Sequence, residues 1–266
     1  MMIAIVMFFV TSTSLAQNNT AVIEQLGNSY EATITQVGNG NSAVLVQGMP
    51  SWNQPNMKKE GWIEQTGDGN TASVEQASHR SRVGVVQTGD GNETYSKVAN
   101  TTGGGSVAQA FVTQIGNDNF ASQDHNGAGY KPDKEYDLMV IKQTGNDNEA
   151  YQDLKTNYYE SFASITQTGN DNFASQTMQR NMESQILQEG NENTAITLQE
   201  GKLGNAWIHQ YGDSNGATIN SFGDNNTAVV NQVGNSNFVA VTQHSSFNSV
   251  HINQNGNSGT AIVTQN

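Results

Sequence analysis

The chain has 266 residues, a formal net charge of −13 and a charged content of only 13%. An acidic chain is repelled by polyphosphates and anionic lipids, which argues against nucleic acid and anionic membranes as partners. Cysteine is absent and hydrophobic residues make up 35% of the chain, so neither disulfides nor an ordinary apolar core accounts for its folding. Asparagine and glutamine fill the gap, since their amides can point inward when they stack in hydrogen-bonded ladders.

The first 16 residues differ from the rest of the chain. An apolar run over residues 3–10 is followed by small residues, Ser14 and Ala16. This pattern is typical of a secretory signal peptide that is cleaved before Gln17, and the run is too short to span a bilayer. Because no Lys or Arg precedes the run, a short buried strand is the alternative. We expect residues 1–16 to be a signal peptide and residues 17–266 to form one secreted domain without membrane insertion.

A unit of eleven residues recurs toward the end of the chain. It reads Asn-x-Ala-x-Ile/Val-x-Gln and continues into a four-residue turn with Gly at its second position, as in NTAVVNQ followed by VGNS. Seven alternating residues favour a strand, and four residues rich in Gly and Asn favour a tight turn. Two units, 22 residues, make one rung of a stacked array whose repeats bury their faces against their neighbours. The period places these residues at equivalent positions: Gln188, Gln199, Gln210, Ser221, Gln232, Gln243, Gln254 and Gln265.

Ten rungs are marked by the tripeptide Gln-x-Gly. Glycine at a fixed turn position predicts a backbone with positive φ, and β-branched residues two places before each Gln predict an apolar ladder along one sheet. The marker glutamines are Gln36, Gln65, Gln87, Gln114, Gln143, Gln167, Gln188, Gln210, Gln232 and Gln254. The turn glycines are Gly38, Gly67, Gly89, Gly116, Gly145, Gly169, Gly190, Gly212, Gly234 and Gly256. The asparagines three residues later are Asn41, Asn70, Asn92, Asn119, Asn148, Asn172, Asn193, Asn215 and Asn237, with Gly259 at the tenth place. The β-branched residues are Ile34, Ile63, Val85, Val112, Ile141, Ile165, Ile186, Ile208, Val230 and Ile252.

These patterns predict an all-β fold, a β-solenoid of about ten two-stranded rungs with two facing, parallel, in-register sheets. Residues 20–25 form a half rung ahead of the first full one. The marker spacing varies only between a second strand and the next first strand, so the insertions 48–59, 103–105 and 126–137 are expected on one edge of the stack. Small residues on the intervening strands would let the two sheets approach closely: Ala43, Ala72, Ala121, Ala150, Ala174, Ala195, Ala217 and Ala261.

The residue patterns do not predict catalysis, a cofactor or a resident metal. Residues 212–216 match Gly-x-Ser-x-Gly, but that nucleophile motif requires a strand-to-helix turn, and Ser214 falls on the repeating turn. Aspartates in other turns offer oxygen donors suited to calcium, although tolerance of turn geometry is the simpler interpretation of Asp118, Asp147 and Asp171. The histidines share no ligand spacing, which favours surface or edge positions for His79, His125, His209, His244 and His251.

The repeats resemble those of curlins, the subunits of curli amyloid fibres on bacterial cell surfaces. The family's repeat is Ser-x5-Gln-x-Gly-x-Gly/x-Asn-x-Ala-x3-Gln, and residues 36–47 (QVGNGNSAVLVQ) and 65–76 (QTGDGNTASVEQ) follow its second half throughout. The leading Ser is mostly missing, although Ser81 and Ser161 hold it. The resemblance covers nearly all of residues 17–266 and implies secretion through the outer membrane, nucleated polymerisation and a role in biofilm matrix. It also implies a related curlin subunit and secretion and chaperone machinery as partners, and both a major subunit and a nucleator fit.

We therefore expect a secreted structural subunit, not an enzyme, that stacks end to end into an extracellular amyloid-like fibre for biofilm matrix and adhesion. Both terminal strands, TAVIEQ at 20–25 and TAIVTQ at 260–265, obey the repeat, so both ends are expected to be uncapped templates for another copy.

Two alternatives remain at this point. A polysaccharide-acting β-helix enzyme would need clustered carboxylates or basic residues on one face, and the sequence pattern shows no such cluster. A monomeric secreted solenoid that binds polysaccharide, a surface or ice would present a flat outward array of one residue type. The outward positions are instead mixed, as in Thr33, Trp62, Phe111, Val140, Gln185 and His251.

Overall fold

The computed structural model describes residues 18–27, 30–48, 59–78, 80–102, 107–128, 137–155 and 160–266. Within these ranges the chain forms 21 β-strands and has no helix long and apolar enough to cross a membrane. The all-β prediction is thus confirmed. The expected signal peptide, residues 1–16, lies outside the described residues and stays a prediction.

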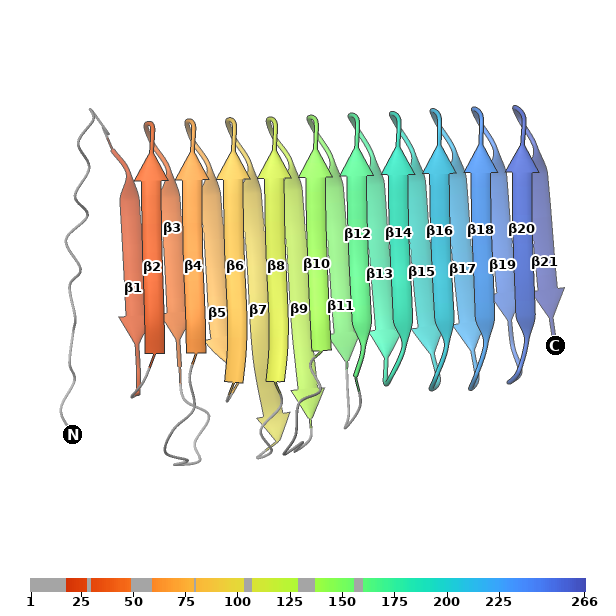
Figure 1. Cartoon of the computed structure of the whole chain (residues 1–266), viewed down its shortest axis with the longest axis horizontal. Helices are drawn as coiled ribbons and strands as arrows, with labels where there is room; N and C mark the ends of the chain where they lie inside the picture. Colours follow the sequence, from red (N-terminus) through yellow and green to blue (C-terminus); the bar gives the residue numbers. More distant parts are fainter. Residues whose placement is uncertain are drawn as a thin grey trace.

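The strands alternate between two sheets that face each other along the whole stack, with the even-numbered strands in front in Figure 1. The ten-stranded sheet contains β2 (Tyr30–Val37), β4 (Lys59–Thr66), β6 (Arg80–Thr88), β8 (Val107–Ile115), β10 (Asp137–Thr144), β12 (Phe162–Thr168), β14 (Glu183–Glu189), β16 (Asn205–Tyr211), β18 (Thr227–Val233) and β20 (Ser249–Asn255). The eleven-stranded sheet contains β1 (Thr20–Gln25), β3 (Ser42–Gln47), β5 (Thr71–Ala77), β7 (Glu93–Thr102), β9 (Phe120–Ala128), β11 (Glu149–Lys155), β13 (Phe173–Gln179), β15 (Thr194–Glu200), β17 (Gly216–Phe222), β19 (Phe238–Gln243) and β21 (Thr260–Gln265).

Neighbouring strands of each sheet are parallel and keep one register. Gln36 pairs with Gln65 in β4, which pairs with Gln87 in β6, and the β-branched column two residues earlier runs in register through all ten strands. The only shift within the described pairs lies beside Asn100, where β7 meets β9. The predicted solenoid of ten rungs with a half rung at β1 is therefore confirmed.

One edge of the solenoid consists of identical tight turns, at the top of Figure 1. Each turn follows a marker Gln, and its second residue is the predicted glycine, with φ between 110° at Gly89 and 132° at Gly256. This backbone region is rarely open to residues with a Cβ. The positive φ expected at the turn glycines is confirmed.

The opposite edge carries the longer connections. The expected insertions fall largely outside the described residues, but the described ends show that 48–59 and 126–137 are shorter than predicted, whereas 103–105 falls between β7 and β8 as expected. Lys59 already begins β4 and Asp137 already begins β10, while β9 continues to Ala128 instead of ending before residue 126. Backbone pairing explains the extension of β9, because β7 and β9 continue to pair beyond Ala99 and Asn126.

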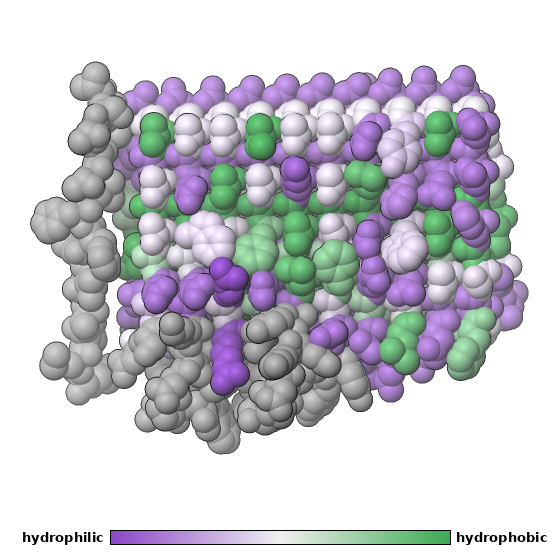
Figure 2. Space-filling model, viewed as in Figure 1, coloured by the Kyte–Doolittle hydropathy of each residue, from purple (hydrophilic) through white to green (hydrophobic). Residues whose placement is uncertain are grey.

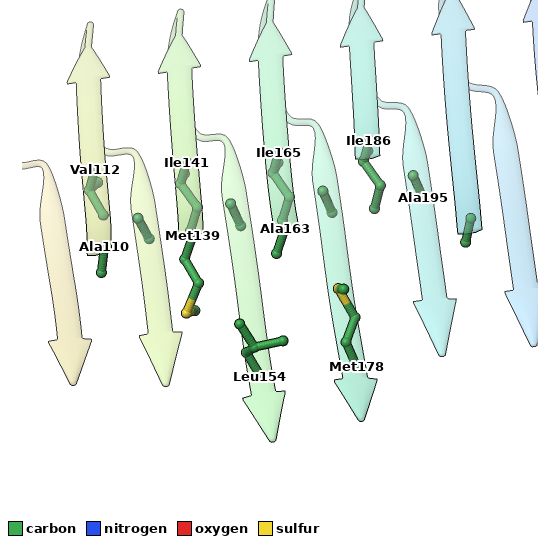
Figure 3. Close-up of a cluster of buried hydrophobic side chains, with 14 of the residues drawn as sticks. Ala110, Val112, Met139, Ile141, Leu154, Ala163, Ile165, Met178, Ile186 and Ala195 are labelled. Atoms are coloured by element: carbon green, nitrogen blue, oxygen red, sulfur yellow. The ribbon is translucent and has the colours of Figure 1, made fainter. Parts of the chain in front are cut away.

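Alternate side chains of both sheets point inward and pack between them. Figure 3 shows Ile141, Ile165 and Ile186 from the ten-stranded sheet, with Leu154 and Met178 from the other. All five are buried, and the β-branched column is half-buried only in the outer strands β2 and β20. Burial of one such side chain stabilises a fold by about 1.5–3 kcal/mol, so the apolar columns hold the sheets face to face and position the polar columns beside them.

Candidate functional site

The marker glutamines form one continuous hydrogen-bonded ladder inside the solenoid. At each of the nine steps from Gln36 to Gln254, the Nε2 of one amide donates to the Oε1 of the next at 2.8–3.0 Å. The same Nε2 groups also donate to backbone oxygens, as Gln143 does to Phe120 O and Asn148 O at 2.9 Å. The amides are thus buried without losing their hydrogen bonds, which removes the usual cost of a polar core.

The predicted asparagines form a second ladder at the start of the eleven-stranded sheet's strands. In the step from Asn41 to Asn70, the Oδ1 of Asn41 accepts bonds from both the backbone N and the Nδ2 of Asn70, at 2.9 and 3.1 Å. The Nδ2 of Asn41 donates to Gly67 O at 2.7 Å, and this pattern is repeated along the stack. Each Asn therefore ties its own turn to the turn of the next rung.

A third ladder runs along the outside of the turns, and the sequence reasoning did not single it out. At each of the nine steps from Asn39 to Asn257, the backbone N of the residue after a turn glycine donates to the Oδ1 of the equivalent residue in the next rung, at 2.7–3.0 Å. Its signal was present in the sequence, because Asn or Asp follows every turn glycine. The residues are Asn39, Asp68, Asp90, Asn117, Asn146, Asn170, Asn191, Asp213, Asn235 and Asn257.

The eleven-stranded sheet has its own glutamine column, which is interrupted in the middle of the molecule. Gln25 donates to Gln47 at 2.8 Å near one end, and Gln243 donates to Gln265 at 3.1 Å near the other. Between them the inward column changes to Val98, His125, Leu154 and Met178, all buried. Amides appear instead at the inward position two residues earlier, where Gln123, Gln152 and Gln176 are linked at 2.9 and 3.0 Å.

Gln199 stands where the column returns to glutamine. Its register neighbours are Met178 on one side and Ser221 on the other, so the adjacent rungs supply no amide. Both its Nε2 and its Oε1 are buried without a hydrogen-bond partner among the described residues. An unsatisfied buried amide of this kind costs about 1–3 kcal/mol. We therefore expect the rung of Gln199 to be less strongly coupled to its neighbours than the rungs whose glutamines are paired.

His125 corrects the expectation that every histidine occupies the surface or an edge. It points inward from β9 and is 1% exposed, and its Nε2 lies 3.0 Å from Asp137 Oδ2 on β10. The other oxygen of Asp137 accepts the backbone N–H of Ser161 at 3.0 Å. The two residues face each other across the core from different sheets, a proximity that spacing along the chain does not reveal. His209 is half-buried, His244 and His251 are exposed, and His79 lies outside the described residues.

Lys59 is a buried cation at the same edge, nearer the N-terminal end of the stack. It is 1% exposed, and its Nζ donates to Gly48 O and to Gln76 O, the latter at 3.2 Å. The ammonium also lies 4.6 Å from the centre of the Tyr30 ring. No carboxylate takes part in these contacts, and burial lowers the pKa of Lys59 to about 8.

This depressed pKa predicts a pH-dependent stability. Between about pH 8 and the ordinary lysine value of 10.5, the unfolded chain binds a proton that folded Lys59 has released. The free energy of unfolding should therefore rise with pH across this window. The variant Lys59→Met should remove that rise and should be more stable than the parent at pH 7. Denaturant unfolding at several pH values measures both effects, and an unchanged slope in the variant would assign the pH dependence to other groups.

The outward face of the ten-stranded sheet is chemically mixed, as the sequence indicated (Figure 2). Trp62 lies half-buried on the face of the ten-stranded sheet, 5.7 Å from the Phe111 ring, where Gly84 between them leaves room for the indole. Figure 2 shows a uniformly hydrophilic row along the turns above a face on which hydrophilic and hydrophobic side chains alternate irregularly. Such a face lacks the single repeated residue type of an ice-binding array.

The residues weighed for other chemistry lie in the repeating turns. Ser214 lies between two strands, β16 and β17, and its Oγ donates to Glu192 Oε2 at 3.1 Å. Asp118, Asp147 and Asp171 adopt φ of 53–55°, the left-handed region that Asp tolerates in turns. Within the described part of the chain, no three His, Cys, Asp or Glu side chains lie close enough together to hold a metal ion.

Parallel strands in one register, a glycine turn in every rung and internal amide ladders define a β-solenoid repeat protein with an amide-laddered core. The model of the curlin associated repeat matches residues 16–48, 205–234 and 234–266. The chain therefore contains curlin-type repeats, which supports its resemblance to the curlin family. The matched segments include both ends of the glutamine column, whereas the altered middle rungs lie between them. The comparison with curated proteins gives no match.

Proposed function

We propose that the chain is a secreted structural subunit that polymerises end to end into an extracellular curli-like fibre for biofilm matrix and adhesion. The observation that carries this proposal is the direction of the glutamine ladders. Gln36 and Gln25 have an Oε1 that receives no amide from a preceding rung, while Gln254 and Gln265 have an Nε2 that reaches no following glutamine in the described chain. One end thus offers acceptors and the other offers donors, so the ladders have a direction and a second copy is expected to add head to tail.

The proposal includes the location and partners that the curlin family implies. Curlin proteins are extracellular curli subunits, which supports a fibre on a bacterial cell surface after secretion across the outer membrane. The partners are further copies of the chain, a related curlin subunit, and secretion and chaperone machinery. The role is structural rather than enzymatic, with residues 1–16 acting as the signal peptide that is removed.

Fibre assembly of purified residues 17–266 tests the proposal. After a lag, the chain should convert into fibres that electron microscopy resolves, with a cross-β diffraction spacing of about 4.7–4.8 Å. A chain that stays monomeric and soluble for weeks at micromolar concentration would contradict the proposal. That outcome would favour the alternative, a monomeric secreted binding module.

One structural feature, a row of aromatic rings, favours the binding-module alternative. On the outer face of the eleven-stranded sheet, the rings of Tyr95, Phe120, Tyr151 and Phe173 follow one another at 5.9, 5.3 and 5.7 Å between centres. Aromatic rows of this kind suit contact with sugar rings, and Glu93 and Glu149 hydrogen-bond the two tyrosine hydroxyls beside them. Retention of the monomer by a polysaccharide column, lost on Tyr151→Ala, would support the binding module.

The C-terminal rungs should assemble most readily. Residues 201–266 contain three charged side chains, Lys202, Asp213 and Asp224, for a net charge of −1, so the remaining −12 lies in residues 1–200. Like charges stacked at about 4.8 Å repel, and long connections cost ordering entropy. A peptide of residues 226–266 is expected to form fibres and to shorten the lag of the full chain, measured in matched assays. A peptide of residues 62–131 should seed poorly, and equal seeding by the two would show that charge and loops do not limit growth.

A further inference from the structure

The two sheets differ by one strand, and this difference matters for the contact between copies. The eleven-stranded sheet begins with β1 and ends with β21, while the ten-stranded sheet begins with β2 and ends with β20. At both ends of the described stack, the outermost strand therefore belongs to the same sheet, as Figure 1 shows. Two copies placed end to end with all strands in place bring β21 of one against β1 of the next.

That arrangement leaves an empty strand position in the other sheet. Neighbouring strands lie about 4.8 Å apart, so β20 of one copy and β2 of the next would be separated by about 9.6 Å. Gln254 and Gln36 could not bond across this gap, and Ile252 and Ile34, already half-buried, would face it. The backbone edges of both strands would also lack partners.

The sequences of β1 and β21 offer a solution, because they match at every inward position. β1 presents Ala21, Ile23 and Gln25 to the core, and β21 presents Ala261, Val263 and Gln265 at the same places. β1 rests on Ala43, Leu45 and Gln47 of β3, and its Gln25 donates to Gln47 at 2.8 Å. A β21 strand from another copy would meet the same three residues with an Ala, a Val and a Gln.

We propose that the β3 edge is the docking surface for β21 of a second copy, and that β1 occupies this edge only until β21 displaces it. This inference rests on the proposed function, since it describes the junction within the fibre. The exchange replaces β1–β3 pairing with equivalent β21–β3 pairing and moves β20 next to β2. Gln265 then donates to Gln47, Gln254 donates to Gln36, and the β-branched column continues from Ile252 to Ile34.

The asparagine ladder does not choose between the two arrangements. Asn41 accepts and donates within the ladder, and its backbone N now donates to Asn19 Oδ1 beside β1. The residue that corresponds to Asn19 next to β21 is Gly259, which has no side chain to offer. The asparagine ladder is therefore interrupted once per junction whether β1 stays or leaves. The gap in the ten-stranded sheet is what favours the arrangement in which β1 is displaced.

Disulfide mapping between copies tests the junction. The outward residue Ile262 of β21 lies opposite Val44 if β1 is displaced and opposite Val22 if β1 stays. Only the nearer pair in each case falls within the 4.4–6.8 Å between Cα atoms that a disulfide tolerates. Fibres from equal amounts of Ile262→Cys and Val44→Cys chains of residues 17–266 should give disulfide-linked heterodimers after mild oxidation. Linkage to Val22→Cys without linkage to Val44→Cys, or fibres without either linkage, would overturn the inference while leaving the proposed function intact.

A lock on β1 provides a second, independent measurement. The double variant Val22→Cys/Val44→Cys ties β1 to β3 when oxidised and should then lose fibre growth, which a reductant should restore. The control Ala240→Cys/Ile262→Cys ties β21 to β19, a contact that persists in both arrangements, and should form fibres in either redox state. Equal fibre growth by the oxidised and reduced forms of Val22→Cys/Val44→Cys would overturn the inference. Failure of the parent chain itself to form fibres would instead reject the proposed function.

Discussion

Replacing Gly67 with alanine is expected to destabilise the solenoid by about 3 kcal/mol or more, since steric overlap and backbone strain act together. Gly67 has φ of 116°, and a Cβ there would lie 2.1 Å from Gly89 O in the next turn. The obstacle is backbone within a ladder, because Gly89 N in turn donates to Thr66 O at 2.9 Å. The clash cannot be relieved by moving a flexible side chain. Denaturant unfolding of the purified chain measures the loss.

Gly69 in the same turn is the matched control. It also has positive φ, 67°, but a Cβ on it would meet no atom within 4 Å. Equivalent turns hold Asp118 and Ser214 at this place with φ of 53° and 56°. Gly69→Ala should therefore cost only the left-handed backbone preference, about 1–2 kcal/mol. Equal losses for the two variants would mean that the turns do not stack as closely as the structure indicates.

Replacing Gln232 with alanine is expected to cost about 1–3 kcal/mol, because it removes two ladder steps and leaves buried groups unpaired. Gln232 Oε1 accepts from Gln210 at 2.9 Å, and its Nε2 donates to Gln254 at 3.0 Å and to Gly216 O at 3.1 Å. The variant should also assemble more slowly if the fibre continues the same ladder. Unfolding free energy and the lag time of assembly are the two measurements.

The control for Gln232 lies on the same strand but on the other face. Thr227 starts β18 at an outward, half-buried position. Thr227→Ala should change the unfolding free energy by no more than about 0.5 kcal/mol, as is usual for surface substitutions. Similar effects of the two substitutions on stability and lag would show that the assignment of inward and outward positions is wrong.

Features that recur along one sheet could be predicted from the sequence. A period of 22 residues places equivalent residues in adjacent strands, so the glutamine ladder, the asparagine ladder and the turn glycines follow from spacing alone. The turn ladder after each glycine carries an equally regular signal, and its role appeared only when backbone N–H groups were seen to donate to those side chains.

Features that depend on contact between the sheets could not be predicted in this way. The pairing of His125 with Asp137 and the burial of Lys59 depend on which strands face each other across the core. In the middle rungs the buried amide lies at Gln152 and an apolar residue, Leu154, takes the usual glutamine position. A pattern based on one marker position does not predict this change. The predicted start of the 126–137 insertion was wrong because backbone pairing extends β9 through residues whose types do not favour a strand.

The pairing pattern has a consequence for how the chain folds and comes apart. Within the described chain, strands pair only with the strands two places before and two places after them, so partner residues such as Gln188 and Gln210 are separated by just 22 positions. Folding then requires only short closures and can spread from any formed rung in both directions, like a zipper. Unfolding proceeds in the reverse sense, one rung at a time from the ends or from a poorly coupled rung such as that of Gln199. Stability in this molecule is a property of neighbouring rungs, and it accumulates with their number.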